Sequence, residues 1–109
     1  TVGIENPVSR TNVYQLKLAY DATLEVAVAW RRYCWSRPYS ALMQDPVAKA
    51  ACQNRRPTAR AVMRAQTQAR TAIVSAENFV AQNPTLSATT IISTAWTALN
   101  AFKAAVPSR

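Results

Sequence analysis

The chain has 109 residues, with 13 Lys and Arg against 5 Asp and Glu, so its formal net charge is +8. This length fits a single domain. It contains no His and one glycine, Gly3, so it lacks the commonest general base and metal ligand and any glycine-rich phosphate loop. We therefore expect no enzyme activity, no metal and no cofactor, whereas the charge predicts an acidic partner.

The first predicted element is an extended arm over residues 1–10, because Pro7 argues against helix there. The first long helix is expected from Asn12 to Trp35, with Thr11 or Asn12 as its cap. Its apolar residues recur every three or four positions and predict one buried face. That face comprises Val13, Leu16, Tyr20, Leu24, Ala27, Trp30 and Cys34.

A connector broken by Pro38 and Pro46 follows, and Asp45-Pro46 is typical of a helix start. This predicts a short helix over Pro46 to Gln53. The second long helix is expected over Pro57 to Gln82, since a residue before proline, here Asn83, is disfavoured in helix. The last helix is expected from near Thr85 or Ser87 to Val106. The buried face predicted for the second long helix comprises Val62, Ala65, Ala69, Ala72 or Ile73, Ala76 and Phe79. The buried face predicted for the last helix comprises Ile92, Ala95, Leu99, Phe102 and Val106.

These elements predict an all-α fold. We expect one helical domain over residues 1–109, an antiparallel bundle of three long helices with a short helix in the first connector. No asparagine-glycine or aspartate-glycine hairpin turn occurs, and no stretch of 18 apolar residues that would indicate a transmembrane segment.

The two cysteines, Cys34 and Cys52, are expected at the same end of such a bundle. A disulfide between them would close a connector of 17 residues, which is worth about 3 kcal/mol in the chain-entropy model. The alternative is a pair of buried free thiols in a cytosolic protein. A disulfide would indicate an extracytoplasmic location, which means the periplasm, the outside of the cell or a virion surface.

The surplus of positive over negative charge lies in the middle of the chain. Nine basic residues and one acidic residue, Asp45, lie between Arg31 and Arg70, so this segment carries the whole surplus of +8. Arginine favours bidentate contacts with carboxylate or phosphate. The predicted partner-binding residues are Arg31, Arg32, Arg37, Arg55, Arg56, Arg60, Arg64, Trp35 and Tyr39.

This cluster has several interpretations. It would suit docking onto other protein subunits with acidic surfaces, binding of nucleic acid, or binding of an anionic envelope. A solvated helix face without a partner is the ordinary alternative. Asp21 and Glu25 share a helix face, yet Lys17 lies four residues before Asp21 and is expected to neutralise it, so we predict no catalytic or metal site there.

Two segments of the chain and the connector between them resemble a known type of protein. YQLKLAYDATLEVAVAWRRYC precedes the connector with its second Cys, and AENFVAQNPTLSATTIISTAWTALNAF follows it. The chain resembles small hypothetical proteins of tailed phages and prophages, which carry an export signal, two such cysteines and an Asn-Pro-Thr link into a final helix. The resemblance implies export and a disulfide but no activity. A start at Thr1 is compatible with a removed leader peptide or with a trimmed N terminus.

We therefore expect a non-enzymatic structural or interaction component of a larger assembly, a virion among the candidates, which docks through its arginine-rich end. The alternative is a basic helical module that binds nucleic acid or an anionic envelope surface.

Overall fold

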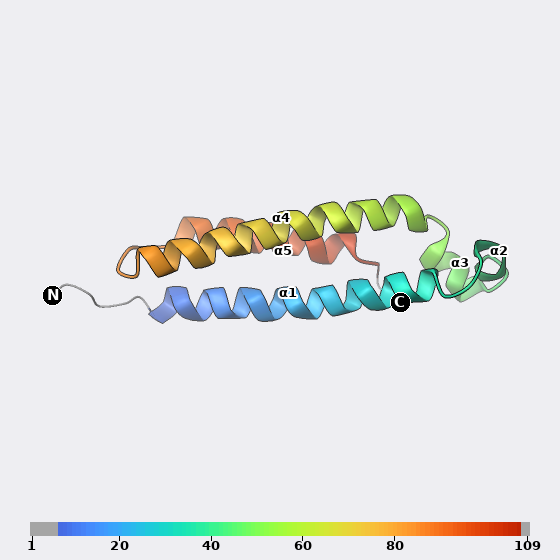
Figure 1. Ribbon diagram of the computed structural model, residues 1–109, viewed down its shortest axis with the longest axis horizontal. Helices are drawn as coiled ribbons and strands as arrows, with labels where there is room; N and C mark the ends of the chain where they lie inside the picture. The colour runs from blue at the N-terminus through green and yellow to red at the C-terminus, as the bar shows by residue number, and fades with distance from the viewer. Residues whose placement is uncertain (1–6, 108–109) are drawn as a thin grey trace.

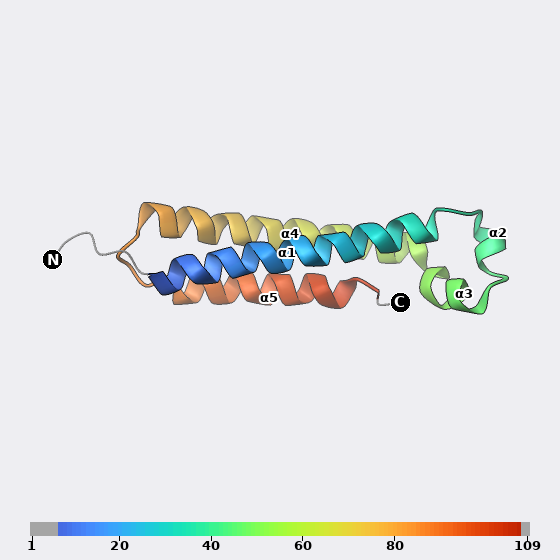
Figure 2. The same ribbon diagram turned by 90° about the horizontal axis from the view of Figure 1, so that it is seen from below.

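The computed structural model describes residues 7–107, which form five helices: α1 (Pro7–Cys34), α2 (Tyr39–Leu42), α3 (Pro46–Cys52), α4 (Arg55–Gln82) and α5 (Thr89–Ala105). α1, α4 and α5 lie along one another, with α4 running opposite to the other two, and α2 and α3 form a cap at one end (Figures 1 and 2). No strand occurs within residues 7–107. The predicted all-helical class and the Cys34–Cys52 disulfide are confirmed.

The buried residues of the long helices follow a seven-residue repeat. In α1 they recur at alternating steps of four and three, and the same steps run through α4 and α5. A repeat of 3.5 residues keeps one face of a helix against its neighbours over many turns. This core contains Val13, Leu16 and Ala27 of α1, Val62, Ala69, Ile73, Ala76 and Val80 of α4, and Ile92, Ala95, Leu99 and Phe102 of α5.

A second core closes the capped end of the molecule. α5 has 17 residues whereas α1 and α4 have 28 each, so α5 ends before it reaches that end (Figure 2). Trp30 fills the remaining space with Cys34, Leu42, Ala48 and Cys52. Its indole Nε1 donates a hydrogen bond to the carbonyl oxygen of Ala51 at 3.0 Å. α3 and Trp30 together therefore cover the part of α1 and α4 that α5 does not reach.

Several boundaries differ from the sequence predictions. α1 begins at Pro7, so residues 7–10 are helical and not an extended arm, because proline is well suited to a first helical turn. Residues 1–6 of that arm lie outside the described residues. α4 begins at Arg55, with Pro57 accommodated in its first turn. The one-turn helix α2 was not predicted, and it begins where the Pro38 carbonyl accepts from the following turn.

Candidate functional site at the basic end

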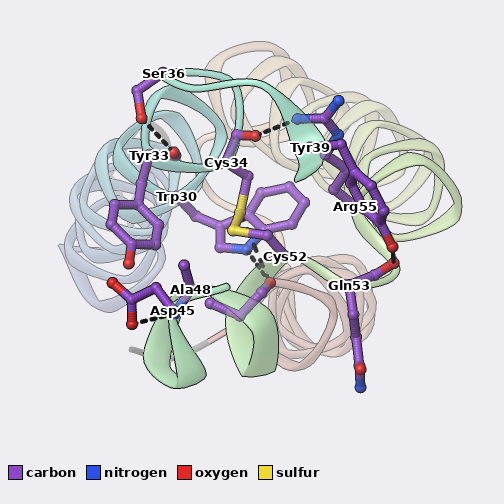
Figure 3. Close-up of a disulfide and its surroundings, with 11 residues drawn as sticks. Trp30, Tyr33, Cys34, Ser36, Tyr39, Asp45, Ala48, Cys52, Gln53 and Arg55 are labelled. Carbon is purple, nitrogen blue, oxygen red and sulfur yellow. Dashed lines mark hydrogen bonds between the residues drawn. A yellow bond between two sulfur atoms is a disulfide. The ribbon is translucent and has the colours of Figure 1, made fainter. Parts of the chain in front are cut away.

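The disulfide joins the end of α1 to the end of α3. Cys34 and Cys52 are both fully buried, with their Cα atoms 5.4 Å apart. Figure 3 shows the bond at the centre of the capped end, with Trp30 packed beside it. Because the bond closes the connector covalently, α2 and α3 are held against the long helices, and the arginines on either side of the connector are brought to one end.

Arg55 acts as a clamp within this end. Its guanidinium Nη1 donates to the carbonyl oxygen of Cys34 at 2.6 Å, as Figure 3 shows. The same group lies over two rings, 4.9 Å from the centroid of Trp35 and 5.2 Å from that of Tyr39. A cation at the last carbonyls of a helix is favoured by the helix dipole, and aromatic faces attract guanidinium groups. Arg55 therefore ties the start of α4 to the end of α1 and to α2.

Three other predicted partner-binding residues also make contacts within the chain. Tyr39 donates its hydroxyl to the carbonyl oxygen of Gln53 at 2.8 Å. The guanidinium of Arg37 lies 6.0 Å from the ring centroid of Tyr33. Trp35 meets Trp30 edge to face at 5.9 Å between centroids and remains 41% exposed. These side chains therefore stabilise the end as well as forming part of its surface.

The remaining five predicted residues form an exposed surface that we call the basic face. Arg31 and Arg32 lie in the last turn of α1, and Arg56, Arg60 and Arg64 follow one another at steps of four along α4. All five side chains are exposed. Since both helix ends meet at the capped end (Figure 1), the five charges belong to one region of the surface.

Asp45, the single carboxylate between Arg31 and Arg70, is a helix cap. Asp45 caps α3, and its Oδ1 accepts from the backbone N–H of Val47 at 2.9 Å and of Ala48 at 3.5 Å. This is the N-cap role that the Asp-Pro pair predicts. The carboxylate is therefore held at the start of α3 by backbone donors.

A depression lies where the connector meets α4. It encloses about 410 Å³ and is lined by Tyr39, Gln53, Asn54, Arg55, Arg56 and Pro57. Sequence reasoning identified Tyr39, Arg55 and Arg56 but missed Gln53, Asn54 and Pro57. The polar run between Cys52 and the long helix was the signal that could have indicated them. With two arginines and two amides around it, the depression suits an anionic oxygen group.

The surroundings of Asp21 and Glu25 include a cation, Lys17, as the sequence predicts. Nζ of Lys17 donates to Oε2 of Glu77 on α4 at 2.6 Å, so Glu77 is its hydrogen-bonded partner, although the charge of Asp21 also acts on Lys17 as predicted. This hydrogen bond, together with the charge of Glu77, raises the pKa of Lys17 above its ordinary value of 10.5. In the described part of the chain, no three His, Cys, Asp or Glu residues cluster as metal ligands would.

No helix formed by the described residues is both long enough and apolar enough to cross a membrane. Comparison of the chain with family models, with curated proteins and with solved structures finds no match.

Proposed function

We propose that this protein is a non-enzymatic interaction component of a larger assembly and docks through its basic end onto an acidic protein surface. In this proposal α1, α4 and α5 form an antiparallel three-helix bundle that serves as a rigid support. The assembly lies outside the cytoplasm, with a virion among the candidates. The observation that carries the proposal is the basic face, five exposed arginines beside a covalently closed cap.

Three features of this end favour carboxylates as ligands. Arginine presents a planar fork that matches a carboxylate, and it is more weakly hydrated than lysine. Arg31 and Arg32 of α1 and the row that starts at Arg56 of α4 project from helices, not from loops. Because the cap is fixed by the disulfide and by Arg55, little backbone ordering is needed when a partner binds.

The second candidate function is binding of nucleic acid or of an anionic envelope surface. The exposed indole of Trp35 beside the arginines favours it, since base stacking and interfacial anchoring both use such a ring. One face of that ring is taken by the guanidinium of Arg55, and the same guanidinium lies over Tyr39. Carboxylates can be bound by the arginines alone, without an aromatic ring, so we rank an acidic protein surface as the first candidate partner.

Site-specific crosslinking tests the proposal. A photoreactive amino acid replaces Arg60 on the basic face, and a matched variant carries it at Lys103, an exposed cation on α5. In the native source we expect Arg60 variants to crosslink to a protein segment rich in Asp and Glu, and Lys103 variants not to. Crosslinks to nucleic acid or to lipid, or equal yields at both positions, would overturn the proposal.

The second candidate has its own test, which uses a 20-base-pair duplex and vesicles that contain phosphatidylglycerol. If it is right, binding weakens steeply with salt, and changing Arg56, Arg60 and Arg64 together to Ala reduces that salt dependence. No binding by micromolar protein at low salt would dismiss it.

The location can be checked from the mass of the protein from its native source. The unreduced chain should be two hydrogens lighter than the reduced chain, because Cys34 and Cys52 are joined. Free thiols in that material would contradict the proposed extracytoplasmic assembly.

A further inference from the structure

We propose that the groove between α1 and α4, beside the basic face, receives an acidic amphipathic helix of the partner protein. This inference rests on the proposed function and adds the form of the partner. The juxtaposition that carries it is an apolar groove floor flanked by arginines, on the side of α1 and α4 that α5 does not cover.

The groove floor is apolar and partly open to solvent. Leu24, Ala27 and Val28 of α1 line it from one side, and Ala59, Val62 and Met63 of α4 line it from the other. Val28 is 40% exposed and Met63 is 54% exposed. An exposed aliphatic pair between two helices gains free energy when another apolar surface covers it.

Arginines border this floor on both helices. Arg31 lines the groove directly and lies three residues after Val28, hence on the same side of α1. On α4, Arg56 and Arg60 precede Met63 by seven and three residues, and these spacings place all three on one helix face. Arg56 and Arg60 border the hollow without lining it, and so do Asp21 and Glu25, which precede Val28 by the same seven and three residues. The two acidic residues precede Val28 in α1 and so lie toward the end of the groove farther from the cap, whereas the three arginines lie toward the cap. A ligand would therefore meet positive charge at the end of the groove nearest the cap.

The opposite side of α1 is already occupied. There Ala19, Thr23 and Val26 line a separate depression with Lys103 and Val106, which lie at the end of α5. α5 thus lies along one side of α1 and α4 along the other (Figure 2). Leu24 and Val28 line the groove together with residues of α4. An incoming helix in the groove would lie beside α1 and α4 without displacing α5.

The size and the chemistry of the groove select this occupant. The hollow encloses only about 60 Å³, far below the roughly 300 Å³ of small-molecule pockets. A partner helix would cover the floor with apolar residues at spacings of three, four and seven, and its flanking Asp and Glu would reach the arginines. A flat membrane surface would meet the exposed Met63 but not Leu24, which is partly buried between the helices.

The test uses two synthetic 21-residue peptides of identical composition. One carries Leu at positions that form a single helix face, with Glu beside them and Ala elsewhere, and the other has the same residues scrambled. Binding is measured by fluorescence anisotropy. We expect the amphipathic peptide to bind at least tenfold more tightly than the scrambled one. The double variant Val28→Gln/Met63→Gln should remove most of this difference, since it takes away the exposed apolar contact.

Leu86→Gln is the matched control, because Leu86 is 54% exposed, as Met63 is, and lies in the loop after α4. It should leave the binding of both peptides unchanged. Equal binding of the two peptides, weakened by Arg60→Gln/Arg64→Gln, would overturn the groove proposal and leave acidic docking intact. Binding of neither peptide would overturn both proposals. Binding of phosphatidylglycerol vesicles that depends on Met63, with no preference between peptides, would assign the groove to a membrane and overturn the helix.

Discussion

Replacing Arg55 by Gln is expected to destabilise the protein by about 2 kcal/mol, whereas the same change at Arg56 should alter stability by less than about 0.5 kcal/mol. The two arginines are neighbours in the sequence, and each substitution removes one positive charge. Arg55 alone donates to the carbonyl oxygen of Cys34 and lies over the rings of Trp35 and Tyr39. Arg56 is exposed at the first turn of α4.

The magnitude follows from these contacts. A hydrogen bond with a charged donor contributes about 1.5 kcal/mol at the lower end of its range, which suits the partly exposed Arg55. The two guanidinium–aromatic contacts share one cation and together add roughly 0.5 kcal/mol at such a site. Gln reaches neither the carbonyl nor the rings in the same geometry. A loss of about 2 kcal/mol corresponds to a fall in Tm of roughly 8–16 °C for a domain of this size.

Urea unfolding followed by circular dichroism and by tryptophan fluorescence measures both variants. Arg55→Lys keeps the charge but not the planar fork, so its stability should fall between those of the wild type and Arg55→Gln. A double-mutant cycle with Trp35→Ala isolates the stacking contribution. If the Arg55→Gln and Arg56→Gln variants proved equally stable, the clamp that we describe would be refuted.

Three further outcomes are expected. Reduction of the Cys34–Cys52 bond should lower the unfolding free energy by about 3 kcal/mol, and a Cys34→Ala/Cys52→Ala variant should not respond to reductant. The stability difference between wild type and Lys17→Gln should be constant near neutral pH and should shrink as pH rises through the raised pKa of Lys17, above 10.5, as alkaline unfolding titrations would reveal. Asp45→Ala should cost about 1 kcal/mol in thermal unfolding, because two backbone N–H groups at the start of α3 lose their acceptor.

The long helices could be predicted from sequence because their cores repeat every 3.5 residues. The spacing of apolar residues from Val13 through Leu16 to Ala27, and from Val62 to Val80, is visible in the sequence alone. It can be recognised without knowing which helix packs against which. The Asp45 cap is equally local. The disulfide pairing followed because only two cysteines exist, one on each side of the connector.

The details that failed depend on local proline chemistry or on contacts between distant residues. The sequence prediction treats Pro7 as a helix breaker, whereas Pro7 occupies a first helical turn, where its missing N–H costs nothing. The charge of Asp21 does act on Lys17, four residues away, but the hydrogen-bonded partner Glu77 was not predicted, because only a folded structure brings it beside Lys17. Arg55 and Arg56 look alike in sequence, and their different roles arise from the position of the Cys34 carbonyl, Trp35 and Tyr39 in space. The groove containing Val28 and Met63 was missed for the same reason.

The placement of the charge and of the covalent bond at one end has a physical consequence. Five exposed arginines on the basic face repel one another, and this repulsion opposes the packing of the end of α1 against the start of α4. That end also lacks α5, so fewer apolar contacts hold it than hold the middle. The disulfide and the Arg55 clamp act at this point and offset both effects. A surface kept strongly positive at a cost in stability is what docking onto carboxylates requires, because a partner's acidic groups would relieve the repulsion when they bind.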